Sequence, residues 1–435
     1  MKGFFFVIIL TVLPRFQSAQ LEGTSIGEII VLGYVFAEIA LKSIWRSNNN
    51  YTIKRVTFIS ILVLVYLLLI SLISASNGAS LIIIAALLAR LAVFFYVLND
   101  VQNIRFSQLP TLKRYLACFS VGGLVVMILN LLTGTKTGAY GLGFYSVTAA
   151  NLSGYLANAT LACYVLVKIM QSLYTDKLKL SFNLADNLVI ASIAFISILT
   201  LSRTAIISCG LSLMCILPSM LKEIPNLISK AFYTLLTNKI FLALPVAIIF
   251  LVTISMGSPM VIKFVDILEK VLYRFGNLDF NLADLNSFAE GIASTGRIAN
   301  KVPEINRLIA DFNVLEFFIG RGLGYSLSWS KSADFGGMDS QIYAIFVDTG
   351  LVGLLTITIV AASMILGVLA EFTRLGIKNK NIHLLYISAI FNFGFLFTNE
   401  YIYLLPSYAM AGFLFGLILW MKNELSCFKS CKTIS

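Results

Sequence analysis

Residues 200–207 read TLSRTAII, and they lie between two almost wholly apolar runs, 187–200 and 204–217. Arg203 is the only charged residue of this stretch, and no Asp or Glu lies within ten residues of it on either side. Two long apolar runs separated by a few polar residues predict a helical hairpin that crosses a membrane twice. The stretch therefore decides the class of fold, and it places a lone cation at the tip of the hairpin.

The composition indicates a polytopic helical membrane protein. The chain has 435 residues, of which 58% are hydrophobic and 12% are charged, whereas soluble domains carry about 25% charged residues. The mean hydropathy is +0.89. The apolar runs are too long for the strands of an outer-membrane barrel, and they lack the period of two that such strands show.

We predict an all-α polytopic fold of about twelve transmembrane helices. The apolar runs of spanning length lie near 3–20, 24–42, 55–75, 79–98, 115–133, 152–171, 184–201, 204–221, 240–256, 340–369, 382–399 and 402–421. The predicted organisation is helices 1–9 in 1–256, a large loop in 257–339, helices 10–12 in 340–421 and a tail in 422–435. The first run also resembles a signal peptide, although the predicted topology favours a short first helix.

The positions of the cations orient these helices. Twenty of the 32 Lys and Arg residues are Lys2, those of the tail and those in alternate connections, at 42–55, 105–114, 168–179, 222–239 and 374–380. Because cytoplasmic connections are enriched in Lys and Arg, we expect both termini in the cytoplasm and the large loop on the outer face. The net charge of +11 is then largely a topology signal, and we expect no nucleic-acid partner.

The large loop 257–339 is predicted to be ordered. It holds eight cations and ten acids, together with aliphatic and aromatic residues that argue against disorder. Apolar residues recur at helical spacing over 259–275 and again over 298–315. These patterns predict amphipathic helices, which either lie on the membrane surface or form a cap packed on the helix bundle. The two interpretations are compatible.

Nothing in the sequence predicts a metal or another cofactor. None of the six cysteines forms a CxxC pair, the only histidine is His383, and no DxD motif occurs. Structural zinc sites and Ser-His-Asp chemistry on the outer face are therefore not expected.

Several short motifs follow one another in a definite order. They are Ser202–Arg203 at the hairpin, Ser294–Ile298 (STGRI), Ile319–Tyr325 (IGRGLGY), Met338–Tyr343 (MDSQIY) and Asp348–Gly353 (DTGLVG). This order, within a twelve-helix plan with one large late outer loop, resembles the O-antigen polymerase (Wzy) family and, more distantly, the O-antigen ligases.

The resemblance implies a lipid-diphosphate-dependent glycosyltransferase of lipopolysaccharide biosynthesis. Such an enzyme moves a growing glycan from undecaprenyl diphosphate onto a new lipid-linked repeat unit at the periplasmic face. Its expected partners are these lipid-linked oligosaccharides and membrane lipids, and a chain-length regulator is a further partner that the resemblance leaves open. The chemistry needs no metal if arginines stabilise the leaving diphosphate.

Arg203 and Arg297 are the residues that we expect to bind the diphosphate. A guanidinium beside a helix N-terminus offers a planar fork of donors next to unpaired backbone N–H groups. Arg321, between Gly320 and Gly322, is a third candidate, although the same residues suit a plain turn.

Further candidates are less specific. Arg90 falls near the middle of its apolar run, so it either pairs with Glu38 or reaches the diphosphate from the cavity floor. Asp348 is open to the same two interpretations, structural or functional. Asp339 and Glu290 are candidate general bases for the attacking sugar hydroxyl, between which the sequence does not choose.

Two other functions compete. The ligases carry a functional outer-face histidine near the end of the loop, where this chain has Met338–Gln341 (MDSQ), and this departure favours the polymerase. A lipid-linked oligosaccharide flippase or another transporter would suit twelve helices, but transporters usually have short connections. The sugars, their linkage, the choice between O-antigen and capsule and the oligomeric state are not encoded in any recognisable motif.

Overall fold

The computed structural model describes residues 2–12, 26–45, 69–79, 81–133, 150–174, 182–200, 203–221, 306, 309–326, 341–377, 379–394 and 405–432. Within these ranges every regular element is a helix. Five helices there are long and apolar enough to cross a membrane, over Leu81–Gln102, Phe106–Asn130, Leu152–Tyr174, Tyr343–Arg374 and Leu405–Cys427. The chain is thus a helical protein of membrane type, whereas the count of twelve spans stays a prediction.

The chain divides into two compact units. Unit 1 is formed by Met1–Ile104, Leu282–Ile377 and Leu396–Ser435, and unit 2 by Arg105–Asn281 and Lys378–Phe395. Unit 1 contains α1 (Lys2–Val12), α2 (Ile26–Trp45), a helix over 69–76, α4 (Leu81–Gln102), α14 (Val314–Ile319), α16 (Gln341–Arg374) and α18 (Leu405–Lys432). Unit 2 contains η2 (Phe106–Gln108), α5 (Leu109–Thr133), α6 (Ala150–Tyr174), α7 (Leu184–Leu199), α8 (Arg203–Leu221) and α17 (Lys380–Gly394).

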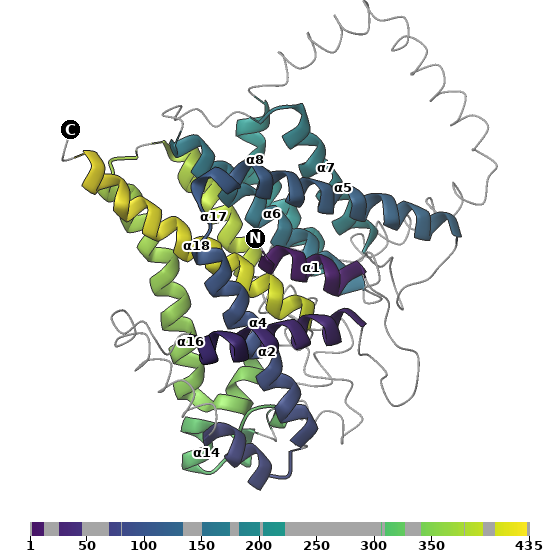
Figure 1. The fold of residues 1–435 in the computed structure, drawn as a ribbon, viewed down its shortest axis with the longest axis vertical. Coiled ribbons are helices and arrows are strands. Elements are labelled where there is room, and N and C mark those ends of the chain that lie inside the picture. Colours follow the sequence, from purple (N-terminus) through teal and green to yellow (C-terminus); the bar gives the residue numbers. More distant parts are fainter. Residues whose placement is uncertain are drawn as a thin grey trace, which may run out of the picture. The chain divides into compact units, whose positions relative to one another are not determined.

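The pair α4 and α18 forms the centre of unit 1, where α18 runs beside both α4 and α16 (Figure 1). The two helices approach closely because α18 carries the sequence GFLFG from Gly412 to Gly416. A Cβ at Gly412 would lie 2.5 Å from the carbonyl oxygen of Phe94, and one at Gly416 would lie 2.9 Å from that of Leu98. Small residues spaced by four are a common means of bringing membrane helices into backbone contact.

The first helix belongs to the core of unit 1. α1 contacts α2, α4 and α18 (Figure 1), and its Phe4 and Leu10 are buried. The backbone N–H of Gly3 donates to the carboxylate of Asp100 on α4 over 2.9 Å, which satisfies an N–H group that the start of a helix leaves unpaired. Of the predicted run 3–20, the structure describes residues up to 12.

α16 is bent, and α14 packs beside the bend. Gly350 has φ 65° and ψ −168°, outside the helical region, in the middle of the 34-residue segment. Asn313 begins α14 by a reciprocal cap: its side chain accepts the N–H of Glu316 over 2.8 Å, while Glu316 accepts the N–H of Asn313 over 3.0 Å. The predicted helical face over 298–315 is therefore interrupted, because Phe312 and Asn313 lie outside any helix.

Unit 2 is organised around α6. This helix contacts α5, α7, α8 and α17, and its side chains from Leu152 to Val167 are buried on every face. The two helices predicted around TLSRTAII are confirmed, since α7 ends at Leu199, α8 begins at Arg203 and the two are in contact. That they cross a membrane stays a prediction.

The positions of the predicted apolar runs can be compared with the described helices. Each predicted apolar run overlaps a helix except 240–256, which lies outside the described residues. α18 continues to Lys432, so most of the predicted tail 422–435 extends the last helix. The extension is physically simple, because MKNELSCFKSCK after Trp420 contains no Gly or Pro to end a helix.

Replacing Gly412 by Ala should separate α18 from α4. The added methyl would meet backbone, which cannot rotate away, so we expect the free energy of unfolding to fall by about 1–3 kcal/mol. The measurement is the Tm of the purified protein in detergent. Gly210→Ala is the matched control, because nothing lies within 4 Å of that Cβ on α8, and an unchanged Tm for both variants would contradict the close contact.

Candidate functional site

A loop of unit 1, residues 320–326, requires glycine at three alternate positions, and it is called the glycine loop below. Gly320, Gly322 and Gly324 have φ values of 77°, 102° and 81°, a region that side chains with a Cβ disfavour. A Cβ at Gly320 would also lie 2.5 Å from the carbonyl carbon of Asp348. The IGRGLGY motif is therefore a closely packed backbone, in which Gly320 lies against α16, Gly322 against the helix over 69–76 and Gly324 against Leu87 of α4.

Backbone hydrogen bonds join the loop to two helices. The N–H groups of Arg321 and Gly322 donate to the carbonyls of Val347 and Asp348 over 2.9 and 3.0 Å, and that of Leu323 donates to Ile70 over 3.3 Å. α16 offers these carbonyls because its bend at Gly350 interrupts the regular ladder of helical bonds.

Side chains complete the attachment. The Oγ of Ser74 donates to the carbonyl of Leu323 over 2.8 Å, and the amide of Asn77 donates to that of Arg321 over 2.9 Å. The helix over 69–76 and the turn after it thus hold the carbonyl side of the glycine loop.

Asp348 is the central anchor of the loop. Its carboxylate accepts the N–H of Gly324 over 2.9 Å and that of Ser326 over 2.8 Å. The side chain is buried, as is Ser326. A buried carboxylate needs strong donors, and here the two amides supply them. The sequence left either a structural or a functional role open for Asp348, and these contacts fit the structural role.

The guanidinium of Arg321 is also held by its own surroundings. It pairs with Glu316 over 3.3 Å and is 15% exposed. It donates to the hydroxyl of Tyr325 and to the carbonyl of Asp311, each over 3.2 Å, and it lies over the ring of Phe312 at 4.8 Å. These contacts fix the guanidinium, so Arg321 has the geometry of an anchor rather than of an open ligand for a diphosphate.

Arg90 lies in the same region of unit 1. It is half-buried on α4, one helical turn beyond Leu87, the residue that a Cβ at Gly324 would touch at 2.7 Å. Tyr408 on α18 is within electrostatic range of both Arg90 and Asp348. The structure therefore brings Arg90, Asp348 and the glycine loop into one neighbourhood, which the sequence alone could not establish.

Glu38, predicted as a partner of Arg90, has partners from two helices. It accepts from Lys2 at 3.3 Å and from the hydroxyl of Tyr96 on α4. This cluster joins α1, α2 and α4 at one end of unit 1. The pairing of Glu38 with Arg90 stays a prediction.

Arg203 begins α8 in unit 2, and residues next to it in the hairpin are hydrogen-bonded to α6. Asn158 on α6 donates to the carbonyl of Ala205 over 3.1 Å and reaches the hydroxyl of Ser197 at 3.5 Å. Thr200 closes α7 as its C-cap. The hairpin tip is thus fastened to α6, and the helix N-terminus that begins at Arg203 has a fixed position within unit 2.

The remaining predicted site residues lie outside the described part of the chain. These are Arg297, Glu290 and Asp339. Their roles as diphosphate ligand and general bases stay predictions.

A buried ionic cluster in unit 2 was not predicted. The carboxylate of Asp186 on α7 is fully buried and pairs with Lys113 of α5 over 2.5 Å and Lys168 of α6 over 2.6 Å. The hydroxyl of Tyr164 also donates to it over 2.6 Å. Both lysines were interpreted as topology signals. The informative signal was Asp186 itself, an acid within the apolar run 184–201 that calls for partners at the same depth.

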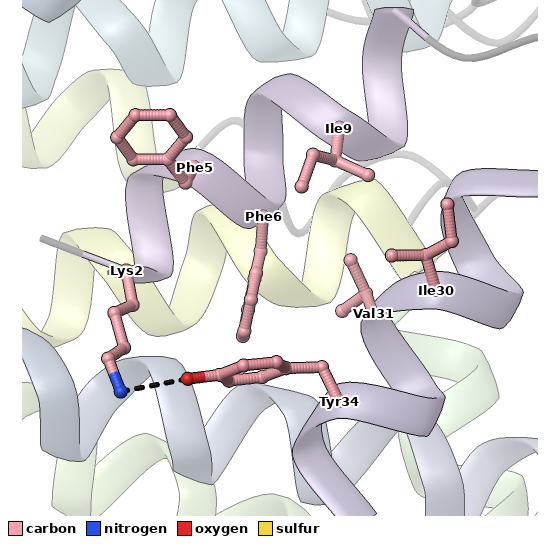
Figure 2. A pocket seen from close by; sticks show the side chains of 7 residues that line it. All are labelled: Lys2, Phe5, Phe6, Ile9, Ile30, Val31 and Tyr34. Atoms are coloured by element: carbon pink, nitrogen blue, oxygen red, sulfur yellow. Dashed lines mark hydrogen bonds between the residues drawn. The ribbon is translucent and has the colours of Figure 1, made fainter.

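Lys2 closes one end of an apolar groove between α1 and α2 (Figure 2). The cavity has a volume of about 370 Å³ and is lined by Lys2, Phe5, Phe6, Ile9, Ile30, Val31 and Tyr34. The ammonium of Lys2 donates to the hydroxyl of Tyr34 over 2.8 Å. The groove suits a hydrocarbon chain.

Comparisons with protein-family models, with curated proteins and with solved structures find no match for this chain.

Asp348→Ala should release the glycine loop. The change leaves the buried N–H groups of Gly324 and Ser326 without acceptors, and we expect a loss of about 2–4 kcal/mol of stability. Hydrogen exchange of the amides at 320–326 should accelerate, measured by mass spectrometry of peptic peptides. Thr349→Val is the control, since it removes a hydroxyl that bonds only within α16, to Ile345. Equal exchange in both variants would refute the anchoring role.

Asp186→Ala should destabilise unit 2. It leaves Lys113 and Lys168 facing each other with no counter-ion, and removal of one member of a buried ionic group costs about 3–5 kcal/mol. A lowered Tm in detergent is the expected result. Ser192→Ala on the same helix removes only a bond to Leu188 and should change the Tm little. A Tm for Asp186→Ala equal to that of this control would show that the cluster contributes nothing.

Proposed function

We propose that this protein is a polysaccharide polymerase of the O-antigen (Wzy) type in the inner membrane of a bacterium. In this proposal it transfers a growing glycan from undecaprenyl diphosphate onto a new lipid-linked repeat unit at the periplasmic face. The observation that carries the proposal is the order of the arginine and glycine motifs from Ser202 to Gly353 in a chain of helical membrane type.

Three structural observations support it. Arg203 begins α8, so its backbone N–H lies at the positive end of a helix dipole. The glycine loop is a built element rather than an irregular connection, because Asp348 and the bend of α16 hold it. The long apolar helices supply surfaces on which a polyprenyl chain can lie.

The reaction assigns each group a simple task. The acceptor hydroxyl attacks the anomeric carbon of the donor glycan, a new glycosidic bond forms, and the bond from that carbon to the diphosphate oxygen breaks. The proton of the hydroxyl passes to a general base, for which Asp339 and Glu290 are the candidates. Arg203 and Arg297 stabilise the charge that develops on the leaving diphosphate.

Arg321 and Arg90 are weaker candidates for diphosphate binding than Arg203 and Arg297. Arg321 would have to leave Glu316 to bind a phosphate, which favours a role in holding the glycine loop. Arg90 is half-buried beside the loop, and it can reach a ligand only if the cavity extends to its depth. Both remain candidate diphosphate ligands.

Deletion of the gene should remove the polymer ladder from the surface lipopolysaccharide and leave core capped by one repeat unit. Complementation with Arg203→Ala or Arg297→Ala should fail to restore the ladder, because loss of one oxyanion donor lowers turnover by about 100-fold or more. The measurement is gel electrophoresis of lipopolysaccharide. Arg114→Ala, which changes an exposed arginine of α5, should restore it fully.

Other band patterns would favour the competing functions. Bare core with polymer accumulating on the lipid carrier would indicate a ligase. Bare core with single repeats retained on the cytoplasmic side would indicate a flippase. Loss of the Arg203→Ala protein from the membrane fraction would indicate a structural role for that arginine, so immunoblotting of each variant accompanies the gel.

A further inference from the structure

The end of unit 1 that carries the glycine loop exposes large aliphatic side chains. Five of them are between 66% and 81% exposed, and together they are called the apolar collar: Leu72, Leu81, Ile82, Val314 and Leu315. They come from the helix over 69–76, from the start of α4 and from α14. α14 packs on α16, as its contacts show.

α14 has no polar face to turn toward water. Its sequence is VLEFFI, and Glu316 is its single charged residue. That carboxylate caps Asn313 and pairs with Arg321, so it is engaged within the protein. Phe317 and Phe318 are also exposed. Large exposed apolar surfaces mark sites that are covered by another apolar phase.

The glycine loop lies below the tip of a helical hairpin. The hairpin consists of the helix over 69–76, the turn at Gly78 and α4. Leu323 bonds to Ile70, eight residues before that turn, and Gly324 lies against Leu87, six residues into α4. At 1.5 Å per residue these separations place the loop about 10 Å below the hairpin tip.

The N–H groups of the loop are all hydrogen-bonded. The N–H groups of residues 320–326 each have an acceptor, in Glu316, Val347, Asp348, Ile70, Gly322 and the two carboxylate oxygens of Asp348. A loop in water has no need of such completeness, since solvent satisfies its amides. A non-helical segment at membrane depth does need it, because lipid offers no hydrogen bonds.

We propose that residues 313–326 form a re-entrant element of unit 1. α14 lies among the acyl chains of the bilayer lipids, and the glycine loop descends beside the hairpin below the membrane surface. The side chain of Asn77 at the turn binds the carbonyl of Arg321, which places this arginine near the boundary between headgroups and acyl chains. The proposal does not depend on the polymerase activity.

Spin labels on α14 test the proposal. A nitroxide is attached to Val314→Cys or Leu315→Cys in a chain whose six native cysteines are replaced, and the protein is reconstituted into liposomes. Oxygen concentrates among acyl chains, whereas a neutral nickel chelate stays in water. We expect frequent collisions with oxygen and few with nickel at both positions, as measured by power-saturation electron paramagnetic resonance.

Two control positions calibrate the result. Met214→Cys, 72% exposed on the apolar helix α8, should report acyl chains, and Asn103→Cys, exposed after the end of α4, should report water. Ratios at 314 and 315 that match Asn103 would overturn the proposal. So would low rates with both reagents, which would mean that protein covers α14.

A second measurement avoids the cysteine replacements. The same two variants in the native background are treated in proteoliposomes with a bulky charged maleimide, and the labelling of the parent chain is subtracted. Slow labelling that becomes fast when detergent dissolves the bilayer supports the re-entrant element. Fast labelling in intact proteoliposomes contradicts it.

Discussion

The structure of unit 1 depends on the acceptors that Asp348 provides. In a segment that is neither helix nor strand and is packed among apolar helices, every backbone N–H needs a hydrogen-bond acceptor. Each N–H without one destabilises the fold by several kcal/mol. The carboxylate of Asp348 and the carbonyls of Val347 and Asp348 accept four of the seven N–H groups of residues 320–326, and the carbonyls of Glu316, Ile70 and Gly322 accept the other three. The three glycines of positive φ fit the same close packing, because a Cβ at Gly320 would collide with α16, one at Gly322 with the helix over 69–76 and one at Gly324 with Leu87 of α4.

In unit 2, too, a buried carboxylate is satisfied by groups from neighbouring helices, but here two of these groups are charged. Asp186 lies where α5, α6 and α7 meet, and two lysines and a tyrosine from the neighbouring helices bind its carboxylate. Apolar helices in lipid gain little from burying apolar surface against each other. Polar contacts of this kind therefore specify which helices pair and in what register. The close backbone approach at Gly412 does the same by its shape.

These anchors give the proposed chemistry a rigid frame. A lipid-diphosphate transferase must hold its cations where the leaving group develops charge, because stabilisation by preorganised donors is lost if the donors have to reorganise. α8 begins at Arg203 and is fastened to α6 through Asn158. The glycine loop is fastened on three sides, and Arg321 is part of that fastening. That Arg321 holds the protein follows from its partners, which residue type does not disclose.

The sequence by itself determined the class of protein and most helix positions. Apolar length and the scarcity of charge identified the helices, and the polar interruption at TLSRTAII located the hairpin and put Arg203 at its tip, because these signals are local. It did not reveal that Arg321 would pair with Glu316, that Asp348 would bind Gly324 and Ser326, or that Lys113 and Lys168 would share Asp186. Only the tertiary structure decided those partners. Asp348 and Lys113 bind groups from other segments of the chain, and Arg321 meets Glu316 five residues away because α14 and the glycine loop fold back on each other. The predicted helix over 298–315 was interrupted for a related reason: the reciprocal cap of Asn313 and Glu316 competes locally with the helical period, and the packing of α14 on α16 selects the cap.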